Sequence, residues 1–174
     1  MNKQRGFTLV ETLLYIAIIG GILTFTVNFS LTILDGQQKA RSYQEAQQNA
    51  RFSVDRISQE IRSALGVNVS SSTFLASPGT LSLSHRDSAK DPTIFDVSES
   101  RIRMRQGTTT SVFLTSDRVV VSSLIFEDLS FTNRTKNIRV SLSLYHSNPE
   151  SSSILNGSTT LQSSVTLRSA EDLP

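Results

Sequence analysis

The sequence predicts an α+β fold in which a long N-terminal helix, half transmembrane and half amphipathic, packs on an antiparallel β-sheet head. Three observations predict it: an apolar run over residues 7–34, helically spaced apolar residues over 35–66, and short alternating segments over 67–174. Apolar residues repeating every three or four positions indicate a helix, and strict alternation indicates strands. A chain of 174 residues has room for one modest head plus an anchor.

The run over residues 7–34 is expected to be a membrane-spanning helix. Its only ionisable side chains are Glu11 and Tyr15, and it exceeds the about 20 helical residues that cross a bilayer. Lys3 and Arg5 precede it. Because basic residues tend to stay on the cytoplasmic side, the leader is expected to face the cytoplasm and the remainder to be exported.

An ordinary secretory signal peptide is the alternative for this run. Such a peptide has an apolar region of about 7 to 15 residues that ends at a small-residue cleavage site of the A-x-A type. The run over residues 7–34 is longer, and Ser30, Leu31 and Thr32 match such a site poorly. The sequence therefore favours a retained anchor.

The residues around Gly6 carry a more specific signal. A basic leader, MNKQRG, ends at Gly6, and the segment FTLVE follows from Phe7 to Glu11. This arrangement resembles the type IV prepilin signature, because the leader, glycine, phenylalanine, glutamate and apolar run are all in register. The resemblance implies that residues 1–6 are a cytoplasmic leader, and that prepilin peptidase cuts between Gly6 and Phe7 and methylates the new N-terminal Phe7.

Glu11 is the candidate assembly residue. A carboxylate within a membrane helix costs a few kcal/mol, so its partner should be sought. No Lys, Arg or His lies between Phe7 and Asp35. The amine that cleavage creates at Phe7 is one partner, one helical turn away, and the same amine of a neighbouring subunit is another. The resemblance favours the neighbour. A solvated Glu11 at the headgroup level is the alternative without an assembly role.

Residues 35–66 are expected to form an amphipathic helix that ends at Gly66. The segment after Gly36 is rich in helix formers and contains no Gly or Pro before Gly66. Charged residues, Glu45 and Glu60 among them, are expected on the faces away from the core. The expected buried stripe consists of Ala40, Tyr43, Ala46, Ala50, Val54, Ile57, Ile61 and Leu65.

Residues 67–174 are expected to form a head of about six short strands. The expected strands are 80–84, 101–105, 111–115, 119–126, 138–145 and 159–169. This order resembles minor pilins and the J-type minor pseudopilins of type II secretion. Many such proteins carry a proline in the membrane half of the helix, but the first proline here is Pro78. Gly20 and Gly21 instead mark a point of close packing or of flexibility there.

The sequence contains no recognisable catalytic, metal or cofactor site, so we expect a protein that is not an enzyme. Without Cys there is no disulfide, thiolate ligand or thiol nucleophile. His85 and His146 lack the spacing of metal ligands and are expected at the surface or at strand edges. No serine has the G-x-S-x-G context of a hydrolase nucleophile, and no phosphate-binding glycine loop is present.

Nucleic acid is not expected to be the main partner. The 17 Lys and Arg nearly cancel the 15 Asp and Glu, which is unlike a nucleic-acid-binding domain. Arg101, Arg103 and Arg105 share one face of an expected strand and could contact phosphate. Such contacts would lack aromatic stacking partners, so this stays a minor alternative.

The resemblance implies a structural subunit, a minor pilin or pseudopilin, of a type IV pilus or a type II secretion pseudopilus. Its implied partners are prepilin peptidase, other pilin or pseudopilin subunits, an assembly platform protein and the membrane. It places the chain in the cytoplasmic (inner) membrane as a single-pass protein with an exported C-terminal head, and then in the pilus or pseudopilus. The alternative is a signal-anchored extracellular binding protein or adhesin that does not polymerise.

Overall fold

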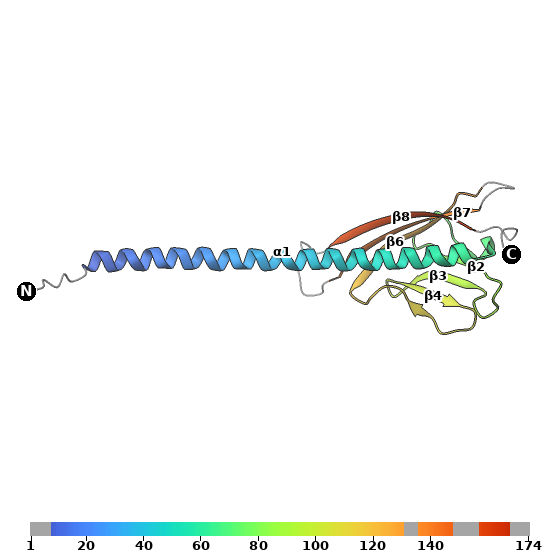
Figure 1. The fold of residues 1–174 in the computed structure, drawn as a ribbon, viewed down its shortest axis with the longest axis horizontal. Helices are drawn as coiled ribbons and strands as arrows, with labels where there is room; N and C mark the ends of the chain where they lie inside the picture. Colours follow the sequence, from blue (N-terminus) through green and yellow to red (C-terminus); the bar gives the residue numbers. More distant parts are fainter. Residues whose placement is uncertain (1–7, 131–135, 148–156, 168–174) are drawn as a thin grey trace, which may run out of the picture. The chain divides into compact units, whose positions relative to one another are not determined.

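The computed structural model describes residues 8–130, 136–147 and 157–167. The chain divides into two compact units, residues 1–39 and 40–174. The described part of the first unit is the N-terminal part of helix α1 (Leu9–Ser63), and the second unit holds the rest of α1 and every described strand (Figure 1). The expected α+β fold, a long N-terminal helix with antiparallel β-sheets, is confirmed.

Helix α1 continues through Gly36 and ends at Ser63. The prediction that this helix extends to Gly66 was therefore wrong, because the helix ends earlier in the chain. The backbone N–H of Leu65 donates a 2.8 Å hydrogen bond to the Ser84 carbonyl oxygen. Because Leu65 already bonds to a strand, the chain leaves the helix before it, and Gly66 opens the first strand instead of terminating α1.

The first sheet has five antiparallel strands in the order β1-β2-β3-β4-β5. The expected strands 80–84 and 101–105 are confirmed as β2 and β4, and the expected strand 111–115 is reduced to the short β5. A 3-10 turn, η1 (Val69–Ser71), follows β1. The strands are β1 (Gly66–Val67), β2 (Leu81–Ser84), β3 (Thr93–Ser98), β4 (Arg101–Gln106) and β5 (Val112–Phe113).

The second sheet has three antiparallel strands in the order β6-β7-β8. Its strands are β6 (Val119–Asp128), β7 (Asn137–His146) and β8 (Ser158–Thr166). They confirm the last three expected strands, although the expected end of the last one, residues 168–169, lies outside the described residues. The strands of the head thus belong to two sheets, where the sequence had suggested one.

One hydrophobic cluster joins the C-terminal part of α1 to both sheets. In Figure 1 the two sheets lie on either side of this part of the helix. Tyr43, expected in the buried stripe, is 46% exposed. Glu60, expected on an outer face, is only 4% exposed. The fully buried members of the cluster include Ala50, Ile57 and Ile61 from α1, Leu81, Phe95 and Ile102 from the first sheet, and Leu124, Phe126 and Leu142 from the second.

Candidate functional site

Glu11 lies in the first turn of α1, where its backbone N–H is capped by Thr8. Thr8 Oγ1 accepts a hydrogen bond from that N–H at 3.3 Å. The Thr8 carbonyl accepts from both the backbone N–H and the hydroxyl of Thr12, at 3.2 and 3.0 Å. Thr8 and Glu11 have the S/T-x-x-E spacing of a capping box. The residues after the expected cleavage point are therefore suited to start a helix.

The carboxylate of Glu11 has one described partner, the Tyr15 hydroxyl, which donates to Glu11 Oε1 at 3.4 Å. Within residues 8–130, 136–147 and 157–167, no cation lies within ion-pair distance of Glu11. Gly6 and Phe7 lie outside the described residues, so the pairing of Glu11 with the Phe7 amine stays a prediction. The geometry leaves the negative charge without a neutralising group from the described part of its own chain.

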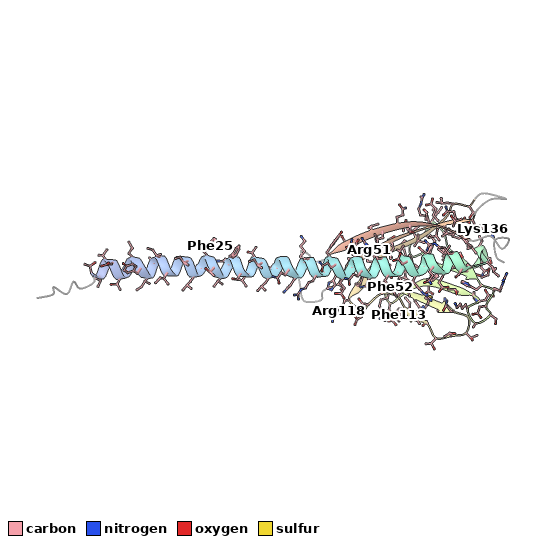
Figure 2. All side chains as sticks on the ribbon, viewed as in Figure 1. Phe25, Arg51, Phe52, Phe113, Arg118 and Lys136 are labelled. Carbon is pink, nitrogen blue, oxygen red and sulfur yellow. The ribbon has the colours of Figure 1, made fainter. Side chains whose placement is uncertain are left out.

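The surface of α1 from Leu9 to Leu34 is largely apolar. Every described residue of the first unit is exposed except Glu11, which is half-buried. Phe25 (Figure 2) is 74% exposed, and its ring stacks on Phe29 with the centroids 6.3 Å apart. Among the described residues, α1 is the one helix long and apolar enough to cross a membrane. Such a surface needs lipid or other apolar helices around it.

The polar side chains of this segment are satisfied within the helix. Thr24 Oγ1 donates to the Gly20 carbonyl at 2.9 Å, and Asn28 Nδ2 donates to the Thr24 carbonyl at 2.9 Å. The hydroxyls of Thr26, Ser30 and Thr32 make the same bond to the carbonyl four residues before them. Because lipid offers no hydrogen-bond partners, this pattern lets a helix with several polar residues sit in a bilayer. In contrast, the charge of Glu11 cannot be satisfied in this way.

Gly20 and Gly21 serve no packing contact within the described chain. A Cβ built on either glycine would meet nothing within 4 Å. Each glycine costs a helix about 1 kcal/mol relative to alanine, and nothing described in this chain offsets that cost. Close approach of another helix, or local loosening of α1, would each account for the pair.

The three arginines of β4 are all paired with acidic neighbours, and two carboxylates offset most of their charge. Asp96, opposite Arg103 in the β3–β4 register, accepts 2.9 and 2.8 Å hydrogen bonds from Arg103 Nε and Nη2 and a 2.9 Å bond from Arg105 Nη2. Arg101 pairs with Glu99 at 2.8 Å and lies 3.7 Å over the Phe113 ring. These pairings leave one of the three positive charges without a carboxylate of its own, and such a small surplus weighs against the nucleic-acid alternative.

Asp96, Arg103 and Arg105 form a cluster, called here the Asp96 cluster, that favours the ionised form of Asp96. Partial burial alone would raise the pKa of Asp96, but the hydrogen bonds and positive charges of Arg103 and Arg105 outweigh that effect. The pKa of Asp96 therefore lies below its ordinary value of 3.8. The same hydrogen bond to Asp96 raises the pKa of Arg103. This cluster joins β3 to β4 and acts as a structural element of the head.

Both histidines face glutamates of α1, which the sequence did not suggest. His85 is buried directly after β2, and its Nε2 lies 3.8 Å from Glu60 Oε2, while Arg56 contacts the other oxygen of Glu60 at 2.7 Å. His146, at the end of β7, has its Nε2 3.3 Å from Glu45 Oε2. The expectation of surface or strand-edge histidines was wrong for His85, because α1 and the first sheet enclose it.

No metal centre is formed by these groups. Among the residues that the structure describes, no cluster of three or more His, Cys, Asp or Glu side chains has the geometry to hold a metal ion. The polar contacts of the head described above are ion pairs and hydrogen bonds between its elements. The candidate functional site of the chain is its N-terminal segment.

Comparison with known families points to the same segment. Residues 1–24 match the family described as the prokaryotic N-terminal methylation motif. No curated protein and no solved structure gives a significant match. The chain thus carries the N-terminal methylation motif of type IV prepilin-like proteins in front of a pilin-like α+β fold. This motif implies processing by prepilin peptidase.

Proposed function

We propose that the protein is a structural subunit, a minor pilin or pseudopilin, of a type IV pilus or a type II secretion pseudopilus. The observation that carries this proposal is the coincidence of two features. The methylation motif covers residues 1–24, and over residues 9–34 α1 is a largely apolar helix whose residues are all exposed except the half-buried Glu11. A processed anchor with this surface is suited to leave lipid and pack with the same helices of neighbouring subunits.

In this proposal, prepilin peptidase cuts between Gly6 and Phe7 and methylates the amine of Phe7. Glu11 then becomes the fifth residue of the mature chain. A buried carboxylate is costly unless it is paired, and the described part of the chain supplies no cation. The amine of a neighbouring Phe7 would neutralise Glu11 and fix how far one subunit is displaced along the filament from the next.

The domain organisation follows from this role. Residues 1–6 are the leader, 7–34 the transmembrane segment, 35–63 the amphipathic remainder of α1, and the residues after α1 form the head. Before assembly the chain is a single-pass protein of the cytoplasmic membrane with its head exported. An assembly platform protein and other subunits then take it into the filament, and the chain itself performs no catalysis.

The leader offers a direct test of processing. Gly6→Leu places a bulky side chain at the scissile bond, whereas Gln4→Leu adds the same side chain within the leader and leaves the bond intact. We expect Gly6→Leu to accumulate as a full-length precursor in the membrane fraction and Gln4→Leu to be shortened like the parent chain. Normal shortening and assembly of Gly6→Leu would defeat the proposal. A chain that is processed but never found in filaments would instead support an anchored adhesin.

A further inference from the structure

In the described residues, every sheet edge except one is short or covered, so that another chain cannot readily pair with it. The first sheet is bordered by β1 and β5, which have two residues each. The outer edge of β6 is covered: its Phe126 carbonyl accepts from the Leu75 N–H at 2.9 Å, and its Leu124 carbonyl accepts from the Gly79 N–H at 2.7 Å. Very short strands and covering loops are the usual ways of blocking an edge from pairing with another chain.

Strand β8, orange-red in Figure 1, is the exception. It has nine residues, Ser158–Thr166, with no charged residue, proline or glycine. It pairs with β7 in one continuous register from Ser158 to Thr166, whereas the β6–β7 pairing is interrupted between Val121 and Ser123. Among the residues that the structure describes, none of the devices that protect the other edges is present along β8.

The hydrogen bonds at its two ends show which backbone groups of β8 face outward. The His146 N–H donates to the Gly157 carbonyl, and the Leu167 N–H donates to the Lys136 carbonyl, both at 2.9 Å. In an antiparallel ladder, hydrogen-bonded and non-hydrogen-bonded pairs alternate, so the odd-numbered residues of β8 bond to β7. The N–H and C=O groups directed away from the sheet belong to Ser158, Thr160, Gln162, Ser164 and Thr166.

These outward backbone groups lie open in the described structure. No backbone hydrogen bond from residues 8–130, 136–147 or 157–167 reaches them. The side chains of the same five residues are exposed. On the inner side, Leu161 is only partly buried against the core, and exposed Tyr43 lies beside Gly157. A strand added here would gain backbone hydrogen bonds and an apolar support for its inward side chains.

We propose that the free edge of β8 binds an extended segment of a different protein of the same filament, which adds as a further strand of the sheet. The inference rests on the proposed function. The segment would carry apolar residues facing α1 alternating with polar ones facing outward, and it needs no charge because β8 has none. Each copy of this chain offers one such edge. Pairing of β8 with β8 of a second copy would therefore use both edges and stop at a two-fold dimer, which does not fit subunits that all point the same way along a filament.

Substitutions at Gln162 test this edge in the full-length chain. Gln162→Pro removes an outward N–H and places the proline ring on the free edge, where proline is tolerated by the strand itself. Gln162→Ala removes the same side chain, including its bond to Ser141 Oγ, but keeps the N–H. We expect Gln162→Pro to lower recovery in the filament fraction about tenfold or more relative to Gln162→Ala, since a blocked strand loses hydrogen bonds and close approach. Equal recovery of the two variants would overturn the proposal.

A crosslinking experiment decides the identity of the occupant without depending on the fold of a proline variant. A photoreactive phenylalanine at Ser164 would sit at the free edge, and the same group at exposed Ser122 on β6 is the control. We expect an adduct with a different protein from position 164 and not from position 122. No adduct at position 164, an adduct with a second copy, or equal adducts at both positions would overturn the proposal. The mature N-terminus, measured on the same samples, shows separately whether the proposed function holds.

Discussion

The backbone N–H of Glu11 donates to Thr8 Oγ1 at 3.3 Å, while the carboxylate of the same residue has no described ion-pair partner. Glu11 therefore has two separable roles. Its backbone belongs to the helix cap, and its side chain carries the charge that we assign to assembly. Substitutions at these two residues distinguish the roles.

Glu11→Gln keeps the size, the backbone donor and the polar side chain but removes the charge. We expect this variant to be processed normally and to be depleted from filaments by about tenfold or more, the effect of losing on the order of 1.4 kcal/mol of pairing. Thr8→Ala is the control, because it removes the cap, worth about 1 kcal/mol, and retains the carboxylate. Filament recovery should stay close to that of the parent for Thr8→Ala. Equal depletion of both variants would mean that the cap, and not the charge, governs assembly.

Gly157 permits a close approach between the head and α1. A Cβ at this position would lie 2.5 Å from the Tyr43 backbone nitrogen and 2.6 Å from its Cα. Gly157→Ala must therefore displace backbone, and we expect the free energy of unfolding of the head to fall by about 1 to 3 kcal/mol. Gly36→Ala is the matched control, since a Cβ there meets nothing within 4 Å. Thermal unfolding of both variants in detergent measures the effect, and an unchanged midpoint for Gly157→Ala would contradict the described packing.

The turn between β3 and β4 contains backbone strain that a glycine can relieve. Glu99 and Ser100 both have left-handed φ angles, 52° and 59°, which cost an ordinary residue about 1 kcal/mol. Ser100→Gly keeps the Ser100 carbonyl that accepts a hydrogen bond from Val121 N–H. We expect this variant to be more stable to denaturant by about 0.5 to 1 kcal/mol. A loss of stability would show that the turn has another conformation.

The same turn explains why β3 could not be predicted from the sequence. Two-residue hairpin turns of this kind are usually signalled by Asn-Gly or Asp-Gly, and here the residues are Glu99 and Ser100. Strand β3 also starts directly after Pro92 and carries Asp96 in its middle. The reason for a charge within that strand becomes visible only when Arg103, opposite Asp96 on β4, is placed beside it.

Other features could be predicted because they depend on local pattern alone. The long apolar run and the spacing of Ala50, Ile57 and Ile61 indicate α1 and its buried stripe, and alternation indicates β6, β7 and β8. The pairing of strands into two sheets depends on contacts distant in sequence, which the pattern does not encode. The burial of Glu60 also involves a contact distant in sequence, because His85 lies beside its carboxylate.

The Asp96 cluster makes head stability depend on pH in the acidic range. Because the pKa of Asp96 is lowered in the folded state, its stabilising contribution is complete above the ordinary aspartate pKa and is lost as the pH falls through the lowered value. We expect Asp96→Asn to reduce the free energy of unfolding by about 1 kcal/mol at pH 7, a value already discounted for solvent screening of this partly exposed cluster.

The difference between the two proteins should shrink as the pH falls from about 5 to 2. Denaturant unfolding at several pH values measures it, with Asp87→Asn as a control, because Asp87 accepts only a local hydrogen bond from the Ala89 N–H. A difference that stays constant across this range would show that Asp96 is not the group that titrates.

The mass of the mature N-terminus tests the central claim most directly. Protein purified from membranes or filaments of its own cells, digested and analysed by mass spectrometry, should begin at Phe7 and carry one additional methyl group on its amine. An N-terminus at Met1, or one beyond Ser30, would contradict the account.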